Sequence, residues 1–168
     1  TGIDLLCYGF PRELTPSLQE LANIYHHWQR AMGAAWSEGL QAIGYAFSDA
    51  DRMTLLQTYR PAHVIALQGN THVKNGVLSE HCVERGFIAS PEKYSDLRIR
   101  TRQAVTLPPY PPADEVLPIL KEAGIKVAIA HPHGYFNQGD RARMDALRHE
   151  CQLDGIECAH RQVPPEFI

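Results

Sequence analysis

The last third of the chain constrains the fold most, because helices and strands alternate there. A short helix is expected over Asp114–Ala123, and the compact apolar run Lys126–Ala130 that follows it is typical of a strand. An amphipathic helix from Gly139 to about Cys151 and a second strand over Gly155–Ala159 complete an α-β-α-β order. This order predicts a parallel sheet covered by helices, since each connecting helix returns the chain to the end where the previous strand began.

The first two thirds predict one strand and then helices. The mostly apolar run Ile3–Phe10 is typical of a short strand, which we expect to lie in the same parallel sheet. Pro16 to about Ile43 predicts one helix about 40 Å long, with Thr15 as its N-cap. Further helices are expected from Ser48 or Asp49 to about Tyr59, within Asn70–Phe87 and over Pro91–Arg98, whereas Val64–Gln68 fits a strand or a helix.

A proline-rich connector separates the two patterns. Four of the five residues Pro108–Pro112 are prolines, so this stretch must be extended. The predicted fold class is therefore α/β. Residues 1–14 and 106–168 form the α/β core in this prediction, and residues 15–105 form a helical insertion.

The composition is that of an ordinary globular protein. Apolar residues make up 44% and charged residues 21%, which excludes disorder of the whole chain. No run approaches 18 apolar residues, so no membrane partner is expected, and a net charge of −3 argues against duplex DNA. The four cysteines form no C-x-x-C pair, which favours reduced thiols in a cytoplasmic protein. There is no motif for serine hydrolysis, nucleotide switching or dinucleotide redox chemistry.

The clearest candidate site follows the strand Lys126–Ala130, where the chain continues as His131-Pro132-His133-Gly134. Ligands of α/β sheets bind beyond the carboxyl ends of the strands, and imidazole is the commonest metal ligand. We therefore expect His131 to hold a metal or an anion; the alternative is a loop histidine that only forms hydrogen bonds. His133 is a further candidate, as are His160 and Glu157, for which a solvated strand face is the alternative.

A second set of candidates lies in the helical region. His72 is expected at the start of a helix, where it has either a structural role or contacts an anion beside the free N–H groups. Arg98, Arg100 and Arg102 recur at steps of two. On a strand they would share one face suited to phosphate, whereas on a helix they would fan out over roughly 200° and form an ordinary solvated face.

Four stretches of the chain, taken together, resemble one known family. They are IDLLCYGF (3–10), NTHV with the helix to ERGF (70–87), the helix from Asp114 leading into KVAIAHP (126–132), and LDGIECAHRQVPPE (153–166). These stretches resemble a strand, the R-P-H segment, the A-H-P segment and the L-x-G-I-E-V strand of the polymerase and histidinol phosphatase (PHP) family. The resemblance is to the branch with a helical insertion, which acts on small phosphoesters or oligonucleotides.

The resemblance implies a fold and a metal site. It implies a partial PHP-like (βα) barrel with a helical insertion, and divalent metals (Mn, Fe or Zn) that activate water and neutralise phosphate charge. His131 would be a metal ligand, and Asp4 would be another at the position of a family histidine, a substitution that suits Mn better than Zn. His72 and the three arginines would hold the phosphate of a small phosphorylated molecule or an oligonucleotide.

The family's N-terminal H-x-H strand and closing D-x-H have no counterpart in these 168 residues, so the chain resembles the middle of the domain, truncated at both ends. We therefore expect a metal-dependent phosphoesterase segment that is inactive or weakly active alone; the alternative is a non-catalytic module that binds anions or proteins. The exposed strand edges of a partial barrel predict a homodimer. The long helix would contribute to it through Trp28, Trp36, Gly33 or Gly39.

Overall fold

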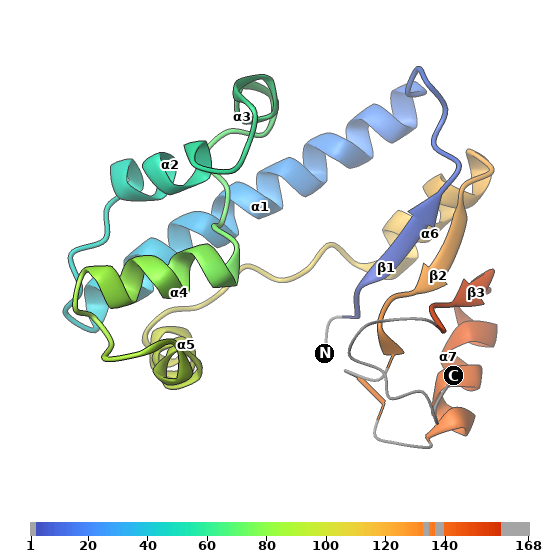
Figure 1. The fold of residues 1–168 in the computed structure, drawn as a ribbon. Helices are drawn as coiled ribbons and strands as arrows, with labels where there is room; N and C mark the ends of the chain where they lie inside the picture. The colour runs from blue at the N-terminus through green and yellow to red at the C-terminus, as the bar shows by residue number, and fades with distance from the viewer. Residues whose placement is uncertain (1–2, 133–134, 137–139, 159–168) are drawn as a thin grey trace. The chain divides into compact units, whose positions relative to one another are not determined.

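The computed structural model describes residues 3–132, 135–136 and 140–158, and within them the chain is mixed α/β and mostly helical (Figure 1). It divides into two compact units. Unit 1 comprises Thr1–Ala22 and Pro111–Ile168, and unit 2 comprises Asn23–Tyr110. The predicted α/β class is therefore confirmed at the level of a small sheet combined with many helices.

Unit 1 contains a three-stranded sheet in the order β1-β2-β3, formed by Leu5–Tyr8, Lys126–Ile129 and Gly155–Ile156. β2 and β3 are parallel, as the α-β-α-β order predicts. β1 is antiparallel to β2, so the prediction of a wholly parallel sheet is wrong for this strand. The physical reason is that a single connecting helix fixes the direction of β3, whereas the whole helical region lies between β1 and β2.

The core of unit 1 packs against this sheet. α6 (Ala113–Glu122) and α7 (Arg141–Glu150) flank the strands in sequence, and the first turns of α1 (Pro16–Ala42) add leucines. Its buried apolar side chains are Leu18, Leu21, Leu117, Leu120, Ile125, Val127, Ile129, Phe136 and Leu153. Each such side chain stabilises the fold by about 1.5–3 kcal/mol when fully buried. The end of β2, where His131 follows, is therefore firmly anchored.

Unit 2 consists of helices. Its elements after α1 are α2 (Asp49–Gln57), α3 (Ala62–Gln68), α4 (Asn75–Glu84), the 3-10 turn η1 (Pro91–Lys93) and α5 (Tyr94–Ala104). The long α1 confirms the prediction from its first residue to within one residue of its end, and Leu18 N donates to the Thr15 hydroxyl at 3.3 Å. The ambiguous stretch at residues 64–68 is helical. Ser48 caps α2 together with Asp51, in a reciprocal capping box.

Two glycines of α1 allow other segments of unit 2 to approach its backbone closely. A Cβ atom at Gly33 would lie 2.6 Å from the carbonyl carbon of Thr71, and one at Gly39 would lie 2.7 Å from Cγ2 of Thr101. Both contacts are far too short for any side chain. These glycines are therefore buried inside unit 2 and do not form the dimer face that the sequence suggested; the dimer itself stays a prediction.

The thiols of all four cysteines are free, and they differ in burial. Cys82 is buried, Cys7 and Cys151 are half-buried, and Cys158 is exposed. Burial raises the pKa of the Cys82 thiol to about 11, so it is protonated at neutral pH. In the described part of the chain, none of the helices combines the length and the apolar character that crossing a bilayer requires.

Candidate functional site

The antiparallel pairing of β1 brings Asp4 beside His131. Leu5 pairs with Ile129, so the residue before β1 lies opposite the residues that follow β2, and Ala130 N donates to Asp4 O at 2.9 Å. Had β1 run parallel to β2, Asp4 would lie at the other end of β2, roughly 10 Å or more away at 3.3 Å per residue. The strand direction that the sequence did not predict is thus what assembles the site.

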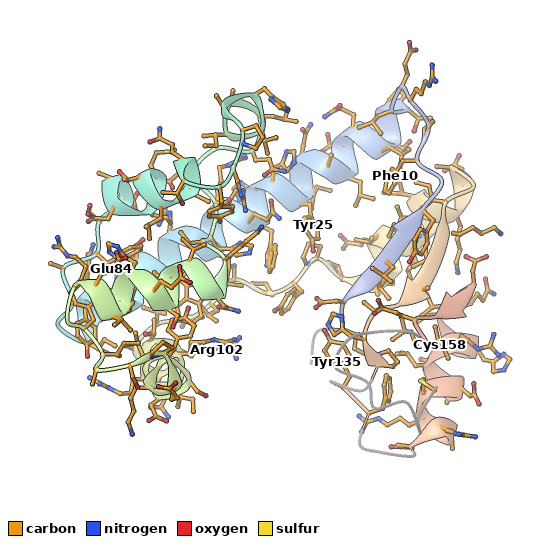
Figure 2. All side chains as sticks on the ribbon, viewed as in Figure 1. Phe10, Tyr25, Glu84, Arg102, Tyr135 and Cys158 are labelled. Atoms are coloured by element: carbon orange, nitrogen blue, oxygen red, sulfur yellow. The ribbon has the colours of Figure 1, made fainter. Side chains whose placement is uncertain are left out.

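A tyrosine joins this pair. His131 Nε2 lies 3.1 Å from Asp4 Oδ2 and 3.1 Å from the hydroxyl of Tyr135, which also accepts a hydrogen bond from Asp4 N at 3.2 Å. Tyr135 lies close to the start of β1 (Figure 2), and its ring centroid is 5.3 Å from that of the imidazole. The side chains of His131 and Asp4 are 36% and 64% exposed, so a ligand can reach both. A hydrogen-bonded pair this exposed contributes at most about 1 kcal/mol to stability.

Glu157 contacts the backbone of His131. The His131 amide donates to Glu157 Oε2 at 2.6 Å, and the amide of Glu157 donates to Ile129 O at 2.9 Å. His131 has a φ of +28°, a left-handed conformation that costs a residue with a Cβ atom about 1–2 kcal/mol. The structure therefore places the Glu157 carboxylate against the backbone of His131, and its role in a site stays a prediction.

The Asp4–His131 pair suits a metal ion in spacing and in chemistry. Two ligands about 2.1 Å from one octahedral ion lie about 3.0 Å apart, close to the 3.1 Å between Asp4 Oδ2 and His131 Nε2. A carboxylate with an imidazole suits Mn, Fe or Zn. Among the described residues, no group of three or more His, Cys, Asp or Glu is gathered to hold a metal. The candidates His133 and His160 lie outside the described residues.

His72 occupies a different environment in unit 2. It lies three residues before α4, so it precedes this helix and does not belong to its first turn. Within the described residues, its buried Nδ1 has no hydrogen-bond partner. Burial, and then the charge of Arg60, lower the pKa of His72, while a hydrogen bond to the backbone of Gln29 acts in the opposite direction. The imidazole is therefore neutral at pH 7.

A buried arginine ties the segment that carries His72 to α1. Arg52 is only 3% exposed, and it donates to Gly33 O at 2.6 Å, to the Ser37 hydroxyl, and to Asn70 Oδ1 at 3.0 Å. It also pairs with the exposed Asp49 at 3.0 Å. Burial lowers its pKa, and Asp49 opposes that shift. Sequence reasoning missed Arg52, because its neutral acceptors come from α1 and from the segment before α4, far along the chain.

A small cavity adjoins Arg52 and His72. Its volume is ≈ 40 Å³, and Asn75 and Tyr94 also line it, joined by a hydrogen bond of 3.3 Å from the Tyr94 hydroxyl to Asn75 Oδ1. This volume has room for roughly two or three water molecules. The cavity is therefore sized for solvent and not for a nucleotide.

The three candidate arginines lie on α5, so the helical alternative applies to them. Residues two apart on a helix point about 200° apart, and Arg98 is half-buried while Arg100 and Arg102 are exposed. The Arg100 guanidinium lies 6.0 Å from the ring centre of Tyr45. They form no single stripe, and their role toward phosphate stays a prediction. The cation beside His72 is Arg60, which the sequence showed only as the residue before Pro61.

Comparison with known proteins gives a fold. No family model matches the chain, and no curated protein matches it. A solved structure is similar: the crystal structure of a "putative metal-dependent phosphoesterase" from Bifidobacterium adolescentis, with a TM-score of 0.64 and 18% sequence identity. The match covers 98% of this chain and 55% of that chain, so the chain spans about half the length of the structure it matches. The chain thus has a fold similar to that of this structure.

Proposed function

We propose that the chain is part of a metal-dependent phosphoesterase of the PHP type, in which Asp4 and His131 bind a divalent metal ion. The observation that carries the proposal is the separation of 3.1 Å between Asp4 Oδ2 and His131 Nε2, beyond the end of β2. When bound, Mn, Fe or Zn would activate a water molecule and offset phosphate charge. Other residues of the chain would hold His131 in place. Tyr135 contacts its imidazole, and Glu157 accepts a hydrogen bond from its backbone amide.

The proposal includes the finer fold. β2, α7 and β3 form one parallel β-α-β unit, which is the repeating element of a (βα) barrel. β1 adds an antiparallel strand at the other edge of β2. We assign unit 1 as part of a distorted PHP-like barrel, with residues 1–14 and 106–168 as the core and residues 15–105 as the helical insertion.

The charge of unit 2 favours a phosphate-rich substrate. It carries nine Lys and Arg against seven Asp and Glu, although the whole chain has a net charge of −3. Residues 54–79 contain no Asp or Glu at all. Two of their cations lie over one ring, with Lys74 Nζ 4.8 Å and the Arg60 guanidinium 5.6 Å from the centre of Tyr59. An anion that approaches this segment meets cations, although the exposed Asp49 lies beside Asn70.

Aromatic side chains favour an oligonucleotide over a simpler phosphoester. The rings of Trp28 and Tyr110 are 4.9 Å apart, and those of Tyr25 and Trp28 are 5.4 Å apart. Tyr25 is 45% and Tyr110 53% exposed. Exposed aromatic rings are one means by which proteins bind single-stranded nucleic acid, because every base has a face that stacks. The proposed substrate class is therefore a short single-stranded oligonucleotide or a nucleotide.

The proposal also covers efficiency and assembly. Asp4 and His131 supply two donors, and a metal held by two protein ligands binds more weakly than one held by three or four. The 168-residue chain is thus proposed to be a weak hydrolase on its own. The alternative is an anion-binding module without catalysis, which the cations of unit 2 would also serve. A homodimer stays part of the proposal, and sedimentation equilibrium at tens of micromolar tests it.

The test is a paired assay in Mn²⁺, with a 5′-labelled single-stranded oligonucleotide and p-nitrophenyl phosphate as substrates. We expect turnover below about 1 s⁻¹ that is lost in His131→Ala and kept in His149→Ala, an exposed histidine of α7. Turnover that does not need Mn²⁺, or that survives His131→Ala, would contradict the metal site. Oligonucleotide binding without any turnover would favour the anion-binding module instead.

A further inference from the structure

The hydrogen-bond pattern between the chain after β2 and the chain after β3 is irregular at His131. In a regular parallel ladder, a residue whose carbonyl accepts from the neighbouring strand is followed, two positions on, by a residue that donates back to that strand. Ile129 O accepts from Glu157 N at 2.9 Å, so the His131 amide is next in turn to donate to the backbone carbonyl of Glu157. It donates instead to the side-chain oxygen Oε2 of Glu157, at 2.6 Å.

This exchange of acceptor coincides with a change in backbone conformation. His131 has a φ of +28°, the left-handed region that residues with a Cβ atom rarely adopt. A regular ladder would keep His131 extended, with its side chain directed as the pleat dictates. The carboxylate of Glu157 reaches the turned amide because its own backbone is fixed to β2 by the bond to Ile129. A charge-assisted bond of this length is among the stronger ones in proteins.

At the other end of β3, a carboxylate also accepts a hydrogen bond from a backbone amide. Asp154 precedes this two-residue strand, and its Oδ2 accepts from Val127 N at 2.9 Å, while Asp154 N donates to Val127 O at 2.8 Å. Two carboxylates therefore bracket Gly155–Ile156: Asp154 accepts from an amide of β2, and Glu157 accepts from the amide of His131, which follows β2. Only the bracket at Glu157 holds a residue of the candidate site, which makes Asp154 a matched comparison within one strand.

We propose that Glu157 is a positioning residue, which holds the His131 peptide in its left-handed conformation and so aims the imidazole at Asp4. The consequence for metal binding rests on the proposed function, whereas the effect on the His131 peptide does not. The turned peptide places Nε2 3.1 Å from Asp4 Oδ2. Glu157 acts through the backbone of His131 and is not itself a metal ligand.

Two readouts test the proposal, and one of them needs no metal. The first is the ¹H–¹⁵N spectrum, in which the His131 amide proton is expected far downfield because it donates to a carboxylate. Glu157→Ala should move this signal upfield and lower the affinity for Mn²⁺, measured by calorimetry, by about 10- to 100-fold. Glu157→Gln keeps a carbonyl acceptor, so it should restore most of the downfield position of the His131 amide and most of the Mn²⁺ affinity. Asp154→Ala should move the Val127 amide but leave the His131 amide and the Mn²⁺ affinity unchanged.

The outcomes separate the explanations. An unchanged His131 amide in Glu157→Ala would overturn the proposal. Equal loss of Mn²⁺ affinity in Glu157→Gln and Glu157→Ala would also overturn it, because it would identify Glu157 as a ligand. If the wild-type chain binds no Mn²⁺, the proposed function fails, and the amide signal alone decides the role of Glu157. Should Glu157→Ala not fold, Glu157→Asp withdraws the carboxylate and is expected to give the same upfield change.

Discussion

Two of the candidate histidines, His131 in unit 1 and His72 in unit 2, lie in opposite surroundings. His131 is partly exposed, with Nε2 3.1 Å from the carboxylate of Asp4. His72 is half-buried beside Arg60, and burial and that positive charge lower its pKa. A histidine beside a carboxylate can share a proton or a cation with it, whereas a desolvated histidine beside a cation is held neutral. The same residue type therefore lies in two environments that favour different chemistry.

The largest effect is expected from removing the arginine that holds the surroundings of His72. Arg52→Ala leaves Gly33 O, Ser37 and Asn70 without their shared donor. We expect it to lower the free energy of unfolding by about 3 kcal/mol, measured by urea denaturation. Arg102→Ala, at an exposed position of α5, is the control and should change it by less than about 0.5 kcal/mol. Equal losses in the two variants would contradict a structural role for Arg52.

Two glycine substitutions test how the segment that carries His72 packs against α1. In Gly33→Ala the new Cβ atom would meet the backbone at Thr71, 2.6 Å away, so we expect a loss of about 2 kcal/mol. Gly76→Ala lies inside α4 with open space around its Cβ position, and it should raise stability by up to about 1 kcal/mol. Urea unfolding of both variants tests the sign. A stabilising Gly33→Ala would show that the segment carrying His72 is not packed against α1.

The pH dependence of stability tests the neutral state of His72. Its folded pKa lies below the ordinary value of 6.5, so the unfolded chain binds the proton more readily. Stability is therefore fully present above about pH 6.5 and falls as the pH drops toward the folded pKa. His72→Gln should make the free energy of unfolding less dependent on pH, by an amount that corresponds to at most about one bound proton. Part of the dependence should remain, because burial also lowers the pKa of His81. An unchanged slope between pH 7.5 and 5 would contradict the prediction.

The smallest effect on stability is expected at the other histidine. Tyr135→Phe removes the hydroxyl that contacts His131 Nε2 and Asp4 N. Because these contacts are largely exposed, we expect a loss of about 0.5–1 kcal/mol in thermal or urea unfolding. A loss above about 2 kcal/mol would mean that this cluster is a core of unit 1 and not an open site.

Local signals explain which parts of the fold could be predicted. The residues Thr15-Pro16 indicate the start of α1, and the spacing of the apolar residues that follow indicates its length. The structure confirms both predictions. The parallel pairing of β2 and β3 was predictable because one helix of ten residues connects them. The direction of β1 was not, since no short connection fixes it.

The candidate site divides in the same way. His131 stood out because it follows an apolar strand, and the family resemblance added Asp4; the structure brings these two together. Tyr135 and Arg52 could not be found from spacing, because Asp4 lies 131 residues from Tyr135 and one acceptor of Arg52 is the backbone carbonyl of Gly33. The three arginines at 98, 100 and 102 show how spacing can mislead. A spacing of two places side chains on one face only in a strand, and this segment is a helix.

The central claim is that His131 and Asp4, and not His72, hold a divalent metal, and Mn²⁺ binding followed by electron paramagnetic resonance tests it most directly. The wild-type chain and the His72→Gln variant should bind Mn²⁺ with similar affinity, because His72 is half-buried beside the positive charge of Arg60 and no carboxylate of the described residues acts on it. Asp4→Asn and His131→Ala should each weaken binding by at least about 10-fold, since each removes one of the two donors. No Mn²⁺ binding by the wild-type chain, or equal loss in all three variants, would contradict the account.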